Sequence, residues 1–341
     1  MTRTPARYRV TSFDVAAEAG VSQSTVSRAL AGSSAITEET RAKVVEAAER
    51  LGYVVDARAA MLRRGQTGTI AVVVIGRQDE SVSDINPFYF SLLGAVSAAA
   101  AEQGYETLVS FQSDKDKLFG RYEERGQADG VIVIGTTTNP DAWRYFRELD
   151  EKGARMAFWG SPYDDLEWIR SDNFEGGQIA THALLDAGCR EIVHIGTLDS
   201  PQRQFGERYE GYSAAMEKAG IQPRIEEVDE NADRESQGRQ AVAALIERKE
   251  SFDGLFIACD SIALGAIDEL RERGISVPGE CCVIGFDGIR AGSHSNPPLT
   301  SVEPDFETAG AMLVRSVLGD KSTPDERRVP VHLLRRGSVR S

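Results

Sequence analysis

Residues 20–30 read GVSQSTVSRAL, a glycine followed by small hydroxyl residues that are interrupted by Val26, Leu30 and one arginine. A short segment rich in hydroxyl groups and carrying an arginine is suited to contact the phosphates of a nucleic acid. The whole chain of 341 residues nevertheless has a formal net charge of −14. Phosphate repels acidic protein, so the distribution of charge along the chain has to be considered.

The charge is unevenly distributed. Residues 1–67 contain ten Lys and Arg against seven Asp and Glu, whereas the remainder contains 29 against 46. A weakly basic head therefore precedes a strongly acidic body. This asymmetry predicts contact with nucleic acid through the head alone.

Length and composition indicate a folded protein of about two or three domains. The longest strongly apolar run, IAVVVIG at 70–76, is far shorter than the roughly 18 residues needed to cross a bilayer. MTRTPARYRV at the N-terminus lacks the apolar stretch of a signal peptide. We expect a cytoplasmic protein without membrane contact. Its cysteines lack C-x-x-C spacing and are expected to be buried free thiols; they are Cys189, Cys259, Cys281 and Cys282.

The N-terminal segment predicts three short helices with a shared core. Residues 11–14, TSFD, have the form of a capping box, and Gly20 ends the first helix. Ser22 can cap a second helix that reaches about residue 31, and Thr37 a third that ends at Gly52. Each helix has one apolar face. The turn between the first two helices has the length expected of a helix-turn-helix.

The second helix carries two sets of polar side chains. The candidates for phosphate contact are Ser22, Thr25 and Ser27. The candidates for base contact on its exposed face are Gln23, Ser24 and Arg28. Glutamine suits adenine and arginine suits guanine in the major groove, so the second helix is a candidate recognition helix. The alternative is a solvated surface helix with small polar residues, and the neighbouring sequence decides between them.

After Thr69 the pattern changes to apolar strands that alternate with helices. The predicted strands are 69–75, 105–110, 130–134, 155–159, 191–196, 253–258 and 281–285, and the predicted helices include 88–103, 174–187, 207–219, 234–249 and 260–273. This alternation predicts parallel sheets covered by helices, and its length favours two α/β lobes. The fold class is thus a small all-α helix-turn-helix head followed by an α/β body of two parallel-sheet lobes. The expected domains are 1–54, a linker at 55–67, and 68–341.

The run VTSFDVAAEAGVSQSTVSRALAGSSAITEETRAKVVEAAERLGY resembles the DNA-binding head of the LacI family of bacterial transcriptional regulators. The similarity continues through DARAAMLRRGQTGTI, SDNFEGGQIATHALLDAG, RYEGYSAAM, VIGFDGI and PPLTSV. It implies a homodimer whose heads read the half-sites of a near-palindromic double-stranded DNA operator. It also implies that Tyr53 contacts the DNA backbone. Leu62 would lie in a linker helix that forms on DNA and would insert into the minor groove. Val55-Asp56 departs from the Pro-Asn usual before this helix.

The resemblance further implies that the body holds a small-molecule effector between its lobes, as periplasmic sugar-binding proteins do. The matching positions are Asn86, Phe88, Trp159, Asp172, Arg208, Cys259 and Asp287. An arginine fork and a carboxylate can together bracket a ligand with several hydroxyl groups. Cys259 replaces the family's asparagine, so the effector is a sugar held differently or is not a sugar. Asp260 is expected to cap the helix that follows.

The function expected from these observations is a repressor of carbohydrate-utilisation genes that is controlled by a saccharide. A non-sugar effector or a corepressor is the alternative, and the head argues against a solute-binding receptor. No G-x-x-x-x-G-K-[ST], G-x-S-x-G or H-E-x-x-H motif is present, so no catalytic set, cofactor or metal is predicted. No leucine heptad follows RRVPVHLLRRGS, which favours a dimer over a tetramer.

Overall fold

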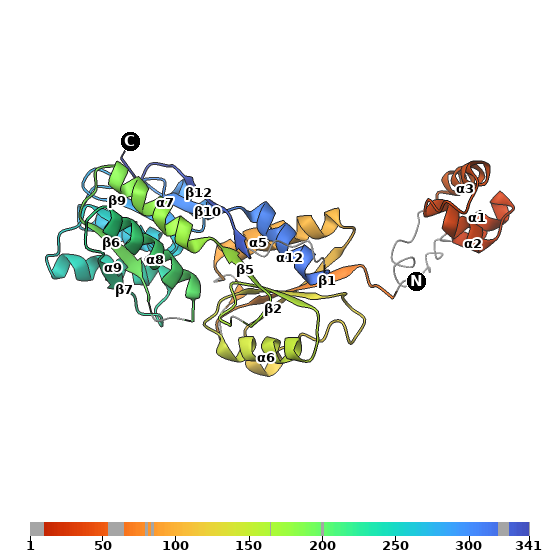
Figure 1. Ribbon diagram of the computed structural model, residues 1–341, viewed down its shortest axis with the longest axis horizontal. Coiled ribbons are helices and arrows are strands. Elements are labelled where there is room, and N and C mark those ends of the chain that lie inside the picture. The colour runs from red at the N-terminus through yellow and green to blue at the C-terminus, as the bar shows by residue number, and fades with distance from the viewer. Residues whose placement is uncertain are drawn as a thin grey trace, which may run out of the picture. The chain divides into compact units, whose positions relative to one another are not determined.

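The computed structural model describes residues 10–53, 65–78, 81–82, 85–163, 165–198, 201–319 and 327–340. Contacts within the chain divide it into two units, Met1–Gln66 and Thr67–Ser341. The first unit contains a helical head and the second contains two α/β lobes (Figure 1). In the described ranges, no helix combines the length and the apolar character that a membrane span requires.

The head consists of α1 (Ser12–Ala19), α2 (Gln23–Leu30) and α3 (Glu38–Leu51). The capping box is present, because the Thr11 amide donates to Asp14 Oδ2 at 2.8 Å. Ser22 and Thr37 cap α2 and α3 as predicted, by accepting from the amides three residues on. One buried face of each helix forms the shared core, which contains Val15, Ala16, Val26, Ala29, Val44, Ala47 and Ala48. The predicted three-helix head is therefore observed.

The first lobe is built on a parallel sheet of strand order β11-β5-β4-β3-β1-β2. Its strands are β1 (Thr69–Ile75), β2 (Glu106–Gln112), β3 (Val131–Gly135), β4 (Met156–Trp159), β5 (Trp168–Ser171) and β11 (Arg328–Val329). Its helices are α5 (Pro87–Glu102), α6 (Pro140–Glu151) and α12 (Phe306–Val317), with a short 3-10 turn at Lys115–Lys117. Strands β1 and β3 are buried along nearly their whole length, which explains their uninterrupted apolar sequences.

The second lobe has strand order β12-β10-β9-β8-β6-β7, in which only the pairing of β10 with β12 is antiparallel among the strands described. Its strands are β6 (Ile192–Gly196), β7 (Ile225–Glu227), β8 (Gly254–Ile257), β9 (Cys282–Phe286), β10 (Thr300–Pro304) and β12 (Val331–Leu334). Its helices are α7 (Asn173–Asp186), α8 (Arg203–Lys218), α9 (Arg234–Glu247), α10 (Asp260–Glu272) and α11 (Arg290–His294). The two-lobe prediction is confirmed.

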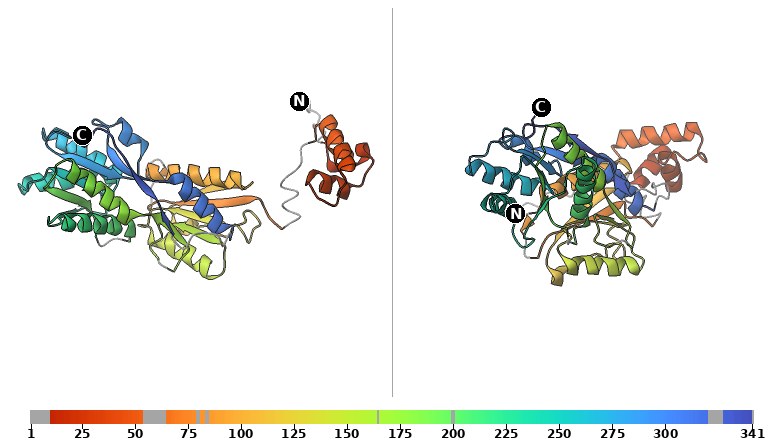
Figure 2. Two further views of the ribbon diagram at one scale, coloured as in Figure 1. Left: turned by 45° about the horizontal axis from the view of Figure 1, so that its top comes forward. Right: turned by 60° about the vertical axis from the view of Figure 1, so that its left-hand side comes forward.

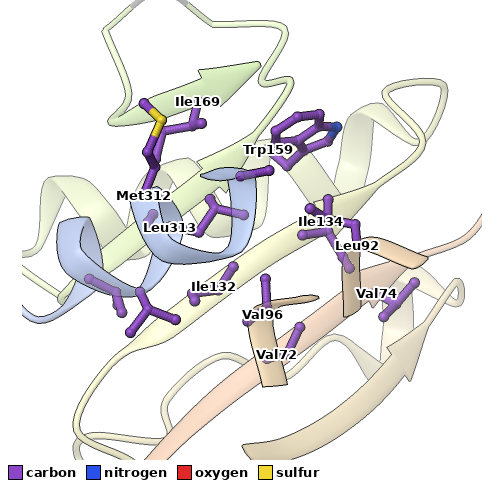
Figure 3. Close-up of a cluster of buried hydrophobic side chains, with 14 of the residues drawn as sticks. Val72, Val74, Leu92, Val96, Ile132, Ile134, Trp159, Ile169, Met312 and Leu313 are labelled. Carbon is purple, nitrogen blue, oxygen red and sulfur yellow. The ribbon is translucent and has the colours of Figure 1, made fainter. Parts of the chain in front are cut away.

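The chain passes between the lobes more than once, which the linear pattern does not show. Helix α12 and strand β11 follow the second lobe in sequence but belong to the first lobe, where α12 packs along α5 (Figures 1 and 2). Figure 3 shows Met312 and Leu313 of α12 in the same buried cluster as Leu92 of α5 and Ile132 of β3. Both lobes are therefore tied together by the C-terminal part of the chain.

Several short elements were not predicted from the sequence. Strands β5, β7 and β11 have four residues or fewer, and their charged residues interrupt an apolar pattern. Helices α6 and α12 were also missed, although Asn139 and Asp305 cap them. The predicted linker helix lies at residues 56–64, outside the described residues.

Helices α9 and α10 approach each other closely through glycine. A Cβ atom at Gly238 would lie less than 3.0 Å from the backbone oxygen of Ile262, and one at Gly265 would lie equally close to that of Glu235. Because these obstacles are backbone atoms, neither position has room for a side chain. The contact holds α10, whose N-terminus faces the space between the lobes, at a fixed height over the sheet.

Candidate DNA-binding and effector-binding sites

Arg28 is the distinctive cation of the head. The described head contains four cations, of which Arg41 pairs with Glu38, Lys43 with Glu39, and Arg50 with both Glu18 and Glu46. Arg28 is exposed on α2 and forms no salt bridge with any residue of 10–53. Its guanidinium is therefore available for an anion or a base edge, and in this respect it differs from the other three.

The predicted recognition helix presents a connected row of hydroxyl groups. Ser22 Oγ lies 2.8 Å from both Ser24 Oγ and Thr25 Oγ1 and accepts a hydrogen bond from the Thr25 amide at 3.1 Å. Ser22 and Ser24 are exposed, whereas Thr25 and Ser27 are partly buried. The row is a set of donors at the N-terminus of a helix, where backbone amides also favour an anion.

Gln23 and Tyr53 are held by the head itself. The Gln23 side-chain amide donates to Ser12 Oγ at 3.2 Å, which connects the start of α2 to α1. Tyr53 is partly buried and packs against the core of the head. Leu62 lies outside the described residues. The folded head at 10–53 has six acids to its four cations, so the basic excess comes from the flanking residues 1–9 and 54–67.

A cavity of about 50 Å³ lies between the lobes. It is lined by Asn86, Phe88, Tyr89, Trp159, Gly160, Arg170, Ser171, Asn173, Gln202, Gln204, Phe205, Arg208, Arg234, Cys259 and Asp287. A second cavity, of about 410 Å³, shares Asn86, Tyr89, Gln202 and Arg234 with it. The lining residues follow the carboxyl ends of strands in both sheets, which is where α/β proteins bind ligands.

Arg208 and Asp287 meet in this cavity as a buried pair. Arg208 Nη2 donates to Asp287 Oδ1 at 3.4 Å, Nε donates to Asn173 Oδ1 at 3.0 Å, and Nη1 donates to the carbonyl of Ala258. Asn86, from the first lobe, donates to Asp287 Oδ2 at 3.5 Å. Burial raises the pKa of the Asp287 carboxyl, and the Arg208 charge opposes that shift. The pair thus presents a cation and an acceptor at one point between the lobes.

The loop that presents Asp287 is strained and is held from behind. Asp287 has φ of 114°, a conformation that costs a non-glycine residue about 1–3 kcal/mol. Asp260 Oδ2 accepts from the Ile289 amide at 2.8 Å and Oδ1 accepts from Ser301 Oγ at 2.6 Å. Ser301 Oγ in turn accepts from the Gly288 amide at 3.0 Å. The prediction that Asp260 caps α10 is wrong, because its carboxylate bonds the loop and the neighbouring strand instead.

Aromatic side chains form one wall of the cavity. Trp159 ends β4 as predicted, but only 6% of it is exposed and its ring packs against Phe88 at a centroid distance of 5.8 Å. Trp159 lines the cavity, but little of its surface is exposed to it. Phe205 of α8 was not predicted, and the guanidinium groups of Arg208 and Arg234 lie over it at 5.5 and 5.1 Å. This arrangement combines apolar surface with hydrogen-bond donors.

Two residues predicted to bind the effector, Asp172 and Cys259, differ in how they relate to the cavity. Asp172 caps α7 by accepting from the Glu175 amide at 2.9 Å, and it is not among the lining residues of the two cavities. Its neighbours Ser171 and Asn173 line the first cavity instead. Cys259 lines it as predicted, but burial raises the pKa of its thiol to about 11, so the thiol is neutral.

A network next to the cavity joins the lobes and was missed by the sequence analysis. Glu207 of α8 accepts from Arg170 Nη1 of β5 at 3.0 Å and from Arg328 of β11 at 2.9 and 3.0 Å. Asn173 also donates to it, at 2.9 Å. Burial alone raises the pKa of Glu207, but these hydrogen bonds and charges outweigh burial and the pKa is lowered. Only the adjacency of Glu207 to Arg208 could have pointed to this network.

The head and the body together define the class of the protein, a DNA-binding regulator with a two-lobed ligand-binding body. The protein-family model described as "Bacterial regulatory proteins, lacI family" matches residues 13–56 of this chain. A second family model, "Periplasmic binding protein-like domain", matches residues 181–339. The HTH-type transcriptional regulator CelR of Thermobifida fusca is 30% identical over 97% of this chain and 99% of its own. The chain therefore belongs to the LacI family and is a helix-turn-helix transcriptional regulator.

Other relatives agree. The transcriptional repressor PurR of Actinobacillus pleuropneumoniae is 29% identical over 96% of this chain and 98% of its own. The solved structure of a CelR-cellobiose complex is 29% identical, with a TM-score of 0.67 over 97% of this chain and 100% of that one. A lac repressor dimer bound to operator has a TM-score of 0.73 over 98% and 100%, and at 24% identity it shows the fold alone. These relatives are regulators and not enzymes.

Proposed function

We propose that this regulator represses carbohydrate-utilisation genes as a cytoplasmic homodimer and that a saccharide in the cavity between its lobes controls operator binding. The observation that carries the proposal is the buried arrangement of Arg208, Asp287 and Asn86 beside an aromatic wall. A guanidinium, a carboxylate and an amide offer donors and acceptors to hydroxyl groups. The CelR relative was solved with cellobiose, which supports a saccharide.

The proposed DNA contacts divide by chemistry. Arg28, Gln23 and Ser24 read bases, and Ser22, Thr25, Ser27 and Tyr53 contact phosphates, with Leu62 as the proposed minor-groove wedge. The unpaired charge of Arg28 supports the first assignment, and the adjoining hydroxyl groups of Ser22 and Thr25 at the start of α2 support the second. A near-palindromic operator would receive two heads, one from each protomer.

Effector control is proposed to act through the angle between the lobes. Asn86 belongs to the first lobe and Asp287 to the second, so a ligand bound by both favours one lobe arrangement. The salt bridges of Glu207 also depend on the angle between the lobes, because Glu207 lies in the second lobe and its partners Arg170 and Arg328 lie in the first. A ligand that prefers one arrangement then changes operator affinity by its differential binding.

The first experiment measures operator binding by full-length protein against salt, with and without cellobiose, cellotriose, glucose or maltose. Repression by the proposed mechanism requires steep loss of affinity with salt and weaker binding with at least one saccharide. Asp287→Asn should abolish the saccharide effect and leave operator binding intact, whereas Arg28→Ala should weaken operator binding and leave the relative effect of the saccharide unchanged. Salt-insensitive binding, or a saccharide response that Asp287→Asn leaves unchanged, would contradict the proposal.

An anionic effector or corepressor is the second candidate. Arg170, Arg208 and Arg234 line the first cavity, where Asp287 is the one carboxylate among its lining residues. Arg234 donates to the neutral side chains of Gln237 and Gln202 and forms no salt bridge with any described residue. Glucose 6-phosphate and glucuronate, compared with glucose in a thermal-shift assay, separate the two candidates. Stabilisation by the anions alone, lost in Arg234→Gln, would favour the second.

A further inference from the structure

Two cysteines from separate segments of the second lobe meet at one backbone carbonyl. Cys189 lies just before β6 and Cys282 begins β9. Cys189 Sγ lies 3.3 Å from the carbonyl oxygen of Asp253, and the amide of Cys282 donates to that same oxygen at 2.9 Å. The two residues therefore meet at the residue that precedes β8.

Gly254 makes room for this approach. It is the registered partner of Cys282 in the parallel pairing of β8 with β9. A Cβ atom at Gly254 would lie 3.1 Å from Cys189 Cβ and 3.3 Å from Cys189 Sγ. Cys189 thus occupies the space above a residue without a side chain, directly beside Cys282.

Arg340 covers both sulfur atoms. Its backbone amide donates to Cys282 Sγ at 3.4 Å, and its Nη2 donates to Cys189 Sγ at 3.1 Å. The rest of the guanidinium donates to neutral carbonyls of Ala187, Pro278 and Gly279 at 3.1 to 3.3 Å. Among the described residues Arg340 forms no salt bridge, so its positive charge is directed to the sulfur pair.

The pair holds one thiolate more easily than an isolated buried cysteine would. The neighbouring Cys189 thiol lowers the pKa of Cys282 against the effect of burial, with help from the Arg340 amide and charge. The same interaction and burial raise the pKa of Cys189. Cys281 is adjacent in sequence, yet burial raises the pKa of its thiol. A thiolate beside a thiol is the starting point of disulfide formation.

We propose that Cys189 and Cys282 form a redox-sensitive pair that hydrogen peroxide converts into an intramolecular disulfide. The Cys282 thiolate attacks one peroxide oxygen, the O–O bond breaks, and the hydroxide released takes up a proton as water, which leaves a sulfenic acid. Cys189 sulfur then attacks Cys282 sulfur, the S–O bond breaks, and the leaving hydroxide takes the Cys189 proton. Overall, two thiols are oxidised, one peroxide is reduced and two waters form.

The disulfide would weaken the contacts that hold Arg340 on the lobe, while its hydrogen bonds to the carbonyls of Ala187, Pro278 and Gly279 remain. It removes the negative charge next to Arg340 and the thiolate acceptor of its amide, which are two of the contacts that hold this residue. Both sulfurs are 0% exposed and Arg340 is partly exposed above them, so movement of Arg340 opens the route for peroxide. Cys282 lies at the start of β9, and the Asp287 site follows the end of that strand. Oxidation is therefore expected to act through the C-terminal segment without occupying the effector cavity.

The test treats the folded full-length protein with hydrogen peroxide, alkylates the remaining thiols, and maps disulfides by peptide mass spectrometry. The expected result is a cross-link between the peptides of Cys189 and Cys282 that dithiothreitol reverses. Cys189→Ser and Cys282→Ser should each abolish it, and Cys259→Ser, also buried and lining the effector cavity, should retain it. Circular dichroism checks that each variant is folded.

Three outcomes would overturn the proposal. The first is full alkylation of Cys189 and Cys282 after peroxide treatment and subsequent denaturation. The second is a cross-link that appears only when peroxide is added to unfolded protein. The third is stable over-oxidation of Cys282 in the wild type with no bond to Cys189. A failed saccharide response has no bearing on these results, because the pair lies apart from the effector cavity.

Discussion

Removal of the Glu207 carboxylate tests whether the network between the lobes stabilises the body. In Glu207→Ala, Arg170 loses its salt bridge to Glu207 while its side chain is only 4% exposed, and the Glu207 side chain itself is 16% exposed. Removal of one partner of a buried salt bridge costs about 3–5 kcal/mol. Arg328 is 37% exposed and can turn to solvent, so we expect the lower half of that range.

The conservative variant Glu207→Gln separates charge from shape. It keeps one acceptor oxygen for Arg328 or Asn173 but loses the charge that strengthens the four hydrogen bonds. Hydrogen bonds to a charged group contribute about 1.5–3 kcal/mol each and are not additive. We expect Glu207→Gln to cost about 2 kcal/mol, less than Glu207→Ala.

The assay is urea unfolding of the body, followed by tryptophan fluorescence at pH 7. Trp168 is a local probe, because the Arg170 guanidinium lies 3.9 Å from its ring centroid. Glu124→Gln is the matched control: its pair with Arg121 is 53% and 63% exposed, and such surface pairs contribute about 0–1 kcal/mol. A Glu207→Ala value within about 1 kcal/mol of wild type, at an unchanged urea dependence, would refute the reasoning.

The network also has a predicted pH dependence. The folded-state pKa of Glu207 is lowered, so its contribution to the free energy of unfolding is fully present above the ordinary glutamate pKa of about 4.3. That contribution is lost as pH falls through the folded-state pKa. The difference between wild type and Glu207→Gln should therefore be constant from pH 8 to 5 and should shrink below pH about 4. If the difference in the free energy of unfolding between wild type and Glu207→Gln stayed constant down to pH 3, the charge of Glu207 would not contribute to stability.

Three further predictions concern other parts of the chain. Burial and the nearby Arg208 lower the pKa of His194 to about 3, so the unfolded state binds a proton first as pH falls below about 6.5. His194→Phe should flatten the pH dependence of urea unfolding below pH 6.5 by up to about 1.4 kcal/mol per unit, and an unchanged slope would contradict this. Gly238→Ala should lower the free energy of unfolding by at least about 1–3 kcal/mol because it meets backbone; Gly94→Ala in α5, with nothing within 4 Å, should be neutral or raise it by about 0.5–1 kcal/mol. Arg28→Ala should weaken operator binding by about 1–3 kcal/mol and relax base preference at one position per half-site in a selection assay; a uniform loss at every base would assign Arg28 to phosphate instead.

The head could be predicted almost completely from its sequence. Its helices begin at Thr11, Ser22 and Thr37 and end near glycines, because caps and left-handed turns depend on residues a few positions apart. The apolar faces then allow one economical packing. The same local reasoning placed seven strands of the body to within about two residues, since buried parallel strands are continuous apolar runs, but it missed β5, β7, β10, β11 and β12.

The site was predictable only in part. Arg208, Asp287, Asn86 and Phe88 lie in the cavity, but they were found through a family resemblance and not from local pattern. Asp172 and Asp260 are both aspartates, and each lies at the start of a helix. In the structure, the first caps its helix and the second holds the Asp287 loop. Their roles depend on partners that the surrounding sequence does not indicate.

Local patterns along the chain were enough to predict the helical head, the alternation of strands and helices, and the separation of a weakly basic N-terminal segment from an acidic body. The tertiary structure alone decided that α12 and β11 return to the first lobe and that Asn86 meets Asp287 across 201 residues. It also decided that Glu207 joins β5 to β11 and that Cys189 lies beside Cys282. Caps and periodicity are local and act over one or two turns of chain. The site and the cysteine pair are contacts between distant segments, and these form only when whole sheets and helices pack.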